Sequence, residues 1–279
     1  MIKDEVNQLF EEQLSEWATA KDNYRALAQV EAKTLNVHGF PYQVQYNPMR
    51  LASVTAQCHA GSTHVRPCFL CAANRSPEQR GVSFKDSYTV LVNPYPIFPR
   101  HFTILSNVHT PQRIASRFGD MLDLAQQLDD DVVFYNGAKS GASIPDHFHF
   151  QAGNKGFLPI EKERGLPNAI RVESGNKEEM LTLFGQIYNS LPLSLEEVEP
   201  MMNILTWYEN EQWTTYVFPR KKQRPACFWD DGEAHILVSP ASVEMGGVLI
   251  TPLRKDFEKI TAAMIVDILN EVCLKKIDI

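Results

Sequence analysis

The side chains with the most evident chemistry lie in one short stretch near the middle of the chain. His147, His149 and Gln151 occupy alternate positions, each separated by one apolar residue. In an extended strand alternate side chains share a face, about 6–7 Å apart, so these three predict one polar face. Phe148 and Phe150 then point to the opposite face and anchor the strand in the core. A neutral imidazole is a nucleophile near pH 7, so the pattern indicates group-transfer chemistry.

A loop of small residues precedes this strand and is typical of an anion-binding site. The loop runs from Asn136 to Ser143, and its glycines let backbone N–H groups approach a ligand closely. Ser140 and Ser143 add hydroxyl donors, and we expect Ser140 and Gly141 to contact substrate. Two histidines on a strand are more often solvated or hydrogen-bonded than catalytic, and the loop shifts that balance. Loop and strand together predict phosphoryl or nucleotidyl transfer.

The segment resembles the histidine-triad superfamily, in the branch whose motif ends in Gln. That branch contains galactose-1-phosphate uridylyltransferase, the diadenosine-tetraphosphate phosphorylases and the GDP-hexose phosphorylases. The resemblance implies that His149 takes up a nucleoside monophosphate and that Gln151 holds the phosphoryl oxygens. It also implies that Asn136 and Ser143 contact phosphate. The chain departs from the family loop at residues 144–146, Ile-Pro-Asp, which seat a carboxylate against the first His of the motif.

Two segments outside the motif also resemble this branch. The family's Asn-x-x-Pro-like strand end lies against the nucleoside, which implies a base contact for Asn93. A plain turn without a ligand contact explains this segment equally well. Residues 239–247 resemble the Pro-Ala-x-x-Glu-x-x-Gly segment of GDP-hexose phosphorylases. This second likeness favours a substrate of the GDP-hexose type.

A Cys-x-x-Cys pair offers two thiolates of the kind that bind zinc. Cys68 and Cys71 need two further ligands, and the candidates are His109 and His147. The resemblance implies the same set and leaves His149 free, with zinc in a chiefly structural role. A redox dithiol or two buried thiols are the alternatives. Three nearby residues are substitute ligands: Cys58, His59 and His64.

The composition is consistent with a cytoplasmic enzyme. The chain has 279 residues, of which 44% are hydrophobic and 22% charged, enough for a full core. Its start has no basic and apolar leader pattern, and no apolar run is long enough to span a bilayer. Five cysteines, an odd number, favour a reducing compartment. A net charge of −7 argues against nucleic-acid binding. We therefore expect neither membrane nor nucleic-acid partners. The sequence does not decide the oligomeric state, for which a homodimer is one candidate.

An anionic substrate in an acidic protein needs local cations. The candidates are Arg50, Lys139, Arg164 and the cluster at residues 220–222. Each is individually more often a solvated surface charge. The cluster is favoured because two prolines bracket it, and Arg220 is its candidate substrate contact.

The elements that position these residues follow a mixed helix and strand order. Apolar spacing over residues 2–17 predicts an amphipathic helix. Residues 88–92 and 101–105 read as successive antiparallel strands. A helix is predicted over 110–128, with Thr110 as its cap and proline at its first position. A strand at 131–135 then leads into the small-residue loop.

The predicted fold class is α+β, with a histidine-triad-like antiparallel sheet, helices and two related halves in one chain. Residues 1–155 form the catalytic half, which carries the Cys-x-x-Cys and His-x-His-x-Gln motifs. Residues 156–279 form the second, substrate-binding half, which lacks the catalytic motif. A weak internal similarity supports the division, since the strand 247–251 followed by a helix to about Cys273 echoes the strand 101–105 and its helix.

The function predicted from these features is nucleotidyl transfer through a nucleotidyl-histidine. The substrate is a nucleoside diphosphate sugar or a dinucleoside polyphosphate, and the acceptor is phosphate or a sugar phosphate. One alternative is a hydrolase in which water replaces the acceptor. The other is a nucleotide-binding protein without catalysis.

Overall fold

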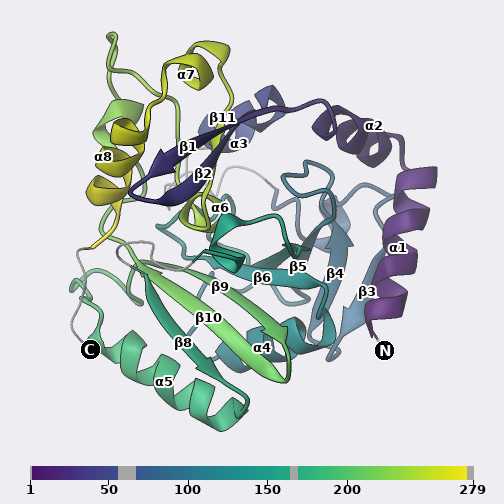
Figure 1. Ribbon diagram of the computed structural model, residues 1–279. Coiled ribbons are helices and arrows are strands. Elements are labelled where there is room, and N and C mark those ends of the chain that lie inside the picture. The colour runs from purple at the N-terminus through teal and green to yellow at the C-terminus, as the bar shows by residue number, and fades with distance from the viewer. Residues whose placement is uncertain (1, 56–66, 164–168, 275–279) are drawn as a thin grey trace.

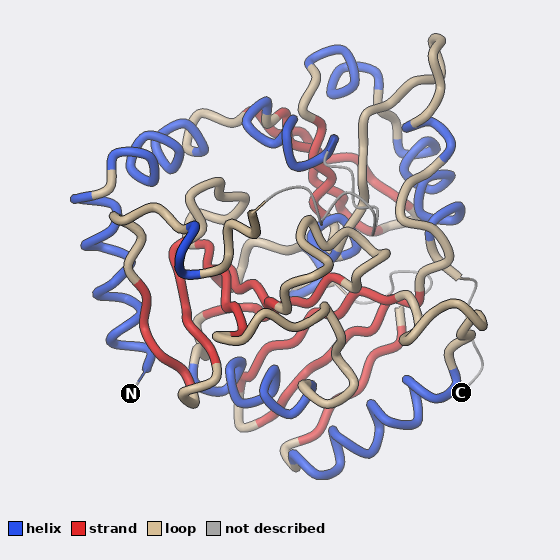
Figure 2. Tube along the Cα trace, turned by 180° about the vertical axis from the view of Figure 1, so that it is seen from behind, coloured by secondary structure: helices blue, strands red, loops and turns tan. Residues whose placement is uncertain are grey.

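The computed structural model describes residues 2–55, 67–163 and 169–274, and its central element is an eight-stranded sheet. The sheet crosses the molecule, with helices around its periphery (Figures 1 and 2). Its strands in spatial order are β3 (Gly81–Phe84), β4 (Tyr88–Val92), β5 (His101–Ser106), β7 (His149–Asn154), β6 (Asp131–Asn136), β9 (Met202–Glu209), β10 (Gln212–Pro219) and β8 (Ile170–Ser174). All neighbouring pairs are antiparallel. The predicted α+β class is confirmed.

Tight two-residue turns join two of the strand pairs, and a three-residue turn joins a third. Both central residues of each two-residue turn have positive φ, as in type I′ turns, whose twist matches that of the flanking strands. The two-residue turns are Asn210-Glu211 between β9 and β10, and His38-Gly39 between β1 (Glu31–Val37) and β2 (Phe40–Tyr46). The three-residue turn at 85–87 joins β3 to β4, and its first two residues also have positive φ. These turns set the register of the hairpins.

A second sheet of three strands lies over the large one (Figure 1). It consists of β1, β2 and β11 (Val248–Thr251), and β11 runs parallel to β2. The strand predicted at 247–251 is therefore present, but it belongs to this separate sheet. One face of the large sheet packs against this layer through residues such as Phe134 and Leu205, which share a core with Val44 and Leu249.

Two helices follow β11 where one was predicted. They are α7 (Arg254–Lys259) and α8 (Ala262–Val272). Thr261 caps α8, and its side chain accepts a hydrogen bond from the N–H of Met264 at 3.3 Å. The cap satisfies the N–H of Met264, which a continuous helix would have bonded internally, so a new helix begins there.

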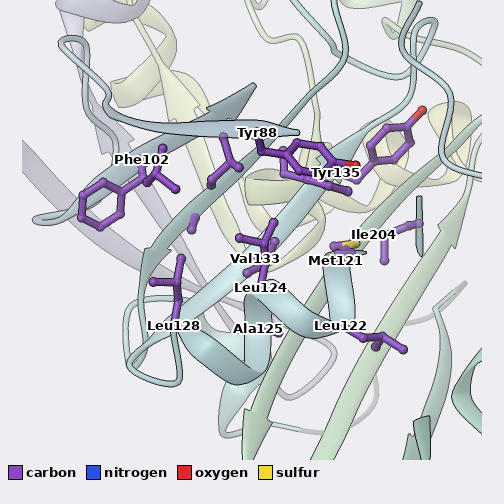
Figure 3. Close-up of a cluster of buried hydrophobic side chains, with 14 of the residues drawn as sticks. Tyr88, Phe102, Met121, Leu122, Leu124, Ala125, Leu128, Val133, Tyr135 and Ile204 are labelled. Atoms are coloured by element: carbon purple, nitrogen blue, oxygen red, sulfur yellow. The ribbon is translucent and has the colours of Figure 1, made fainter. Parts of the chain in front are cut away.

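The other face of the large sheet is covered by α4 (Phe118–Gln127), as Figure 3 shows. Buried residues of this helix, including Met121 and Leu124, point at Val133 and Tyr135 of β6. Helix α5 (Lys177–Ser190) packs beside α4. At the N-terminus α1 (Ile2–Glu16) buries the predicted apolar stripe against β3 and β4, and α2 (Ala18–Leu27) follows it.

The prediction of a helix from Thr110 is wrong, because α4 begins only at Phe118. Residues 110–117 form a linker whose polar groups bond to the motif segment instead. The carbonyl of Thr110 accepts from the N–H of Phe148 at 2.6 Å, and the N–H of Gln112 donates to Pro145 at 3.0 Å. These tertiary bonds override the local capping signal.

The remaining elements are short. They are η1 (Pro48–Arg50), α3 (Leu51–Thr55), η3 (Ala72–Asn74), η4 (Pro159–Glu161), η5 (Ala226–Phe228) and α6 (Ser242–Met245). Strand β6 pairs with β9, so strands from both sides of residue 155 form one continuous sheet. Within the described parts of the chain, no helix has the length and apolar character needed to cross a membrane.

Candidate active site

The His-x-His-x-Gln segment lies at the start of β7 in the middle of the large sheet. His149 is the first residue of the strand, and His147 lies two residues before it. Phe148 and Phe150 are buried on the opposite face, with ring centroids 4.8 Å apart in an edge-to-face pair. The alternation predicted for the motif is thus present, and its apolar half anchors the strand in the core.

The polar face of β7 opens on a cavity of about 220 Å³ between the large sheet and the layer above it. Six of the residues predicted for the site line this cavity: Asn93, Asn136, Gly141, Ser143, His149 and Gln151. The opposite wall includes Arg50, Arg224 and Glu244. The structure therefore brings together the core of the predicted site.

The hydrogen bonds of His149 determine which ring nitrogen is available. Its Nδ1 lies 2.9 Å from the backbone carbonyl oxygen of His147, which can only accept, so Nδ1 carries the proton and donates it. The lone pair is then on Nε2. Burial lowers the pKa of His149 to about 4, so the ring is neutral at pH 7. A neutral imidazole with Nε2 free is the form that a nucleophile needs.

A second buried histidine orients Gln151. Nδ1 of His101 accepts from the N–H of Ile97 at 3.1 Å, which places the ring proton on Nε2. That Nε2 lies 2.9 Å from Oε1 of Gln151 and donates to it. Burial, and then the nearby charge of Arg50, lower the pKa of His101 to about 3, which keeps this donor neutral. The amide NH₂ of Gln151 is therefore the end left to donate to an anion.

The small-residue loop makes a tight turn against α6. Gly141 has a φ of +103°, and a Cβ there would lie 2.6 Å from the Cβ of Ala241, so glycine is required twice over. Ser140 is fully buried and Lys139 pairs with Glu197, so neither is among the cavity-lining residues. Of the two loop serines, Ser143 is the one at the cavity.

Asn136 and Arg220 belong to a hydrogen-bond network beside this loop. Oδ1 of Asn136 accepts from the N–H and the hydroxyl of Ser242, at 2.8 and 2.6 Å, and from Nδ2 of Asn203 at 2.8 Å. Oδ1 of Asn203 in turn accepts from Arg220. These contacts tie β6, β9 and the start of α6 together beside the cavity.

The prediction that Arg220 contacts substrate needs correction. Its guanidinium is buried, at 2% exposure, and each of its nitrogens donates to the protein. Besides Asn203, the acceptors are the carbonyls of Pro240, Lys222, Gln223 and Val272, at 3.0 to 3.2 Å. Arg220 therefore supports the site through Asn203, because its donors are already engaged.

Cys68, Cys71, His109 and His147 form a cluster beside the motif, with their potential ligand atoms within 4.8 Å of one another. Nδ1 of His147 lies 3.3 Å from Sγ of Cys68, and Nδ1 of His109 lies 3.2 Å from Sγ of Cys71. Ligands at 2.0–2.3 Å from a tetrahedral ion are separated by similar spacings. This group can hold a metal ion.

The outer contacts of both histidines also fit metal ligation. Nε2 of His147 lies 2.8 Å from the carbonyl oxygen of Ser106, which fixes the proton on Nε2 and turns the Nδ1 lone pair to the cluster. Nε2 of His109 lies 3.5 Å from Oδ2 of Asp146. Asp146 was expected against His147, and its closest ion-pair geometry is instead with His109. The substitute ligands Cys58, His59 and His64, like Arg164, lie outside the described residues.

The cavity also carries charges that the sequence motifs do not reveal. Nη1 of Arg50 donates to the carbonyl of Tyr95 at 2.9 Å. Burial raises the pKa of Glu244, while Arg50 and Arg220 oppose the rise. One carboxylate oxygen of Glu244 accepts from the N–H of Ala241 at 2.8 Å. Arg50 was among the candidate cations, whereas Glu244 was only part of a family-like segment.

Sequence reasoning missed Gln112 entirely. Its side-chain amide bonds to both backbone groups of His149 and is 1% exposed. The residue falls in the segment predicted as a helix, where a glutamine is unremarkable. His101 falls within the strand predicted at 101–105, and only its contact with Gln151 places it at the site.

Two family models match the chain. One, described as a domain of unknown function (DUF4922), matches residues 9–154, which is more than half of the chain. The other, described as the GDPGP1-like C-terminal domain, matches residues 172–278. The first contains the motif, the loop and the Cys-x-x-Cys pair.

A galactose-1-phosphate uridylyltransferase of Staphylococcus saprophyticus is 28% identical over 155 residues, which cover 53% of this chain and 29% of the relative. The chain therefore matches less than a third of that relative's length. Among solved structures, yeast Ap4A phosphorylase Apa2 is similar with a TM-score of 0.63 and 17% identity, over 92% of this chain and 96% of that one. Its complex with AMP gives 0.59 and 17%, over 94% and 97%.

The fold, the motif strand and these similarities agree. Part of its sequence is similar to a galactose-1-phosphate uridylyltransferase and its fold is similar to that of an Ap4A phosphorylase, and the chain belongs to the DUF4922 family.

Proposed function

We propose that this protein is a nucleotidyltransferase of the phosphorylase type that works through a nucleotidyl intermediate on His149. The observation that carries the proposal is the state of that imidazole: it is neutral, its Nδ1–H is bonded to the carbonyl of His147, and Nε2 is left for attack. Gln151 lines the same cavity, with its amide oriented by His101.

In the first step Nε2 of His149 attacks the α-phosphorus of the substrate. A bond forms between nitrogen and phosphorus, and the bond to the bridging oxygen breaks. The rest of a nucleoside diphosphate sugar then leaves as a sugar phosphate, and the rest of a dinucleoside polyphosphate leaves as a nucleoside polyphosphate. The ring gains positive charge, which the hydrogen bond from Nδ1 to His147 helps to stabilise. Gln151 and Ser143 are placed to donate to the oxygens on which charge develops.

In the second step the acceptor attacks the same phosphorus from the side that the leaving group has vacated. A phosphate oxygen forms the new bond, the nitrogen–phosphorus bond breaks, and the neutral imidazole returns. With phosphate as acceptor the product is a nucleoside diphosphate. Arg50 lines the cavity wall opposite β7 and supplies positive charge for these anions.

A GDP-hexose is the substrate that we favour, with phosphate or a sugar phosphate as the second substrate. The match of residues 172–278 to the GDPGP1-like C-terminal domain supports this choice, as does the segment 239–247, which carries Glu244 into the cavity. Asn93 is the proposed nucleoside contact, and its side chain accepts from the N–H of Tyr95 at 2.9 Å. A dinucleoside polyphosphate is the second candidate, because yeast Ap4A phosphorylase Apa2 has a similar fold and has been solved with Ap4A.

The metal that we propose for the Cys68, Cys71, His109 and His147 cluster is zinc. Two thiolates and two imidazoles match the preference of a structural zinc site, and the ion would supply a rigid crosslink there. The backbone carbonyl of His147 accepts from Nδ1 of His149, so fixing His147 also fixes the partner of the nucleophile.

We also propose a division of labour along the chain. Residues 1–155 provide the nucleophile, the loop and the metal cluster, and residues 156–279 provide part of the opposing wall, beside Arg50. Cavity residues Arg224 and Glu244 come from the second part and support this division.

The experiment that tests the activity is an incubation with GDP-hexose in the presence and absence of phosphate. A phosphorylase releases GDP only when phosphate is present, whereas a hydrolase releases GMP without it. A non-catalytic binding protein raises its melting temperature with the ligand but forms no product, since any ligand that favours the folded state stabilises it.

A further inference from the structure

The strands β6 and β7 separate at the motif. Their backbone pairing runs from Asp131 with Asn154 to Phe134 with Gln151. If the pairing of β6 with β7 continued in the same register, Asn136 would lie opposite His149, in the same orientation as Phe134 opposite Gln151. The side chain of Gln112 takes the place of that pairing.

Three hydrogen bonds hold the Gln112 amide between the separated ends of β6 and β7. Its Nε2 donates to the carbonyl oxygen of Asn136 at 3.0 Å and to that of His149 at 2.8 Å. Its Oε1 accepts from the N–H of His149 at 2.8 Å. A primary amide has two donors and one acceptor oxygen in a plane, so it substitutes for a backbone peptide on both groups of His149.

The linker that carries Gln112 is itself fixed. The N–H of Gln112 donates to Pro145, immediately before the motif, at 3.0 Å. Two residues later the N–H of Ile114 donates to the half-buried carboxylate of Glu199 at 2.8 Å. These contacts leave the amide little freedom, and its side chain is 1% exposed.

We propose that Gln112 is a positioning residue for the nucleophile: by clamping the backbone of His149 it sets the direction of Nε2 and keeps Nδ1–H on the carbonyl of His147. The inference rests on the proposed function in one respect, which is that His149 is the nucleophile. A backbone displaced by 1 Å costs about 10²-fold in rate, because the attacking atom leaves its line with the phosphorus.

Two variants separate positioning from mere support. Gln112→Ala removes all three hydrogen bonds. Gln112→Glu keeps an oxygen for the N–H of His149 but turns a second oxygen to the carbonyls of Asn136 and His149. An ionised carboxylate repels those carbonyls, whereas a protonated carboxyl group donates one bond to them. Gln126→Ala, an exposed glutamine of α4, is the control.

The measurement is the single-turnover rate of nucleotidyl labelling with GDP-hexose, beside the dissociation constant for GDP. We expect Gln112→Ala to lose about 10²-fold in labelling rate while the dissociation constant changes less than about twofold, because the cavity residues are untouched. For Gln112→Glu we expect the rate to rise as the pH is lowered from 8 to 5. Over that range we expect the wild-type rate to stay level.

Nitrogen NMR of the His149 ring gives a readout independent of turnover. The wild-type ring should carry its proton on Nδ1, and in Gln112→Ala the Nε2–H tautomer should become populated. Folded Gln112→Ala that labels at the wild-type rate would overturn the inference and leave the proposed function intact. If the wild-type protein takes no label, the proposed function fails. Independently of labelling, an unchanged His149 tautomer in Gln112→Ala overturns the positioning role of Gln112.

Discussion

The backbone carbonyl oxygen of His147 lies 2.9 Å from Nδ1 of His149, so one motif histidine fixes the tautomer of the other. His147 faces the Cys68 thiol with its own Nδ1, at 3.3 Å. The two rings therefore present opposite nitrogens, Nδ1 of His147 to the cysteine cluster and Nε2 of His149 to the cavity.

The first prediction concerns the metal. We expect about one zinc ion per chain, with Zn–S distances near 2.3 Å. Cys68→Ser should lose the metal and lower the melting temperature, because the ion binds the folded chain and stabilises it. Cys227→Ser, which changes a cysteine outside the cluster, should keep the metal. Elemental analysis that finds no zinc in protein purified without chelator would reject the site.

The second prediction concerns pH. The pKa of His149 is about 4 in the folded state, against 6.5 for an ordinary imidazole. Between these values the unfolded chain binds the proton more readily, so the contribution of this group to stability is full above pH 6.5 and is lost as the pH falls towards 4. Urea unfolding at a series of pH values should show a shallower acid dependence in His149→Gln. An equal dependence in both proteins would mean that the buried imidazole titrates normally.

The third prediction concerns Gln151 and the histidine behind it. Gln151→Ala should slow nucleotidyl labelling by about 10²-fold, the effect of removing one donor to the transition state. His101→Phe fills the same space but removes the donor to Oε1 of Gln151, so the amide is free to flip. We expect slower labelling with unchanged stoichiometry in that variant. A rate equal to that of the wild type would show that His101 does not orient the amide.

The fourth prediction separates two members of the basic cluster. Arg220→Met leaves several buried carbonyls without a donor and should lower the free energy of unfolding by about 3 kcal/mol or more. Lys222→Ala removes only an exposed pair with Glu271 and should change it by less than about 0.5 kcal/mol. Chemical denaturation of both variants measures the contrast. Equal losses would contradict the bracing role of Arg220.

The parts of the site that local patterns encode could be predicted from the sequence. The alternation around His149 follows from strand geometry, and Cys68 and Cys71 lie in one cluster because of their spacing. The role of Gln112 could not be predicted, because it depends on two strands that meet only in the folded protein. Arg220 was predicted to contact substrate, whereas its burial depends on contacts with β9 and with the segment before α6, which the sequence does not reveal. The linker at 110–117 has a helix-capping signal that tertiary hydrogen bonds override.

The central claim is that His149 carries the nucleotidyl group, and trapping that group tests it most directly. Incubated with radiolabelled GDP-hexose, the wild-type protein should acquire a label that is stable in base and labile in acid, as a phosphoramidate on imidazole is. His149→Ala should acquire none while it keeps its fold and its affinity for GDP. Added phosphate should discharge the wild-type label as GDP. Labelling that persists in His149→Ala would contradict the account.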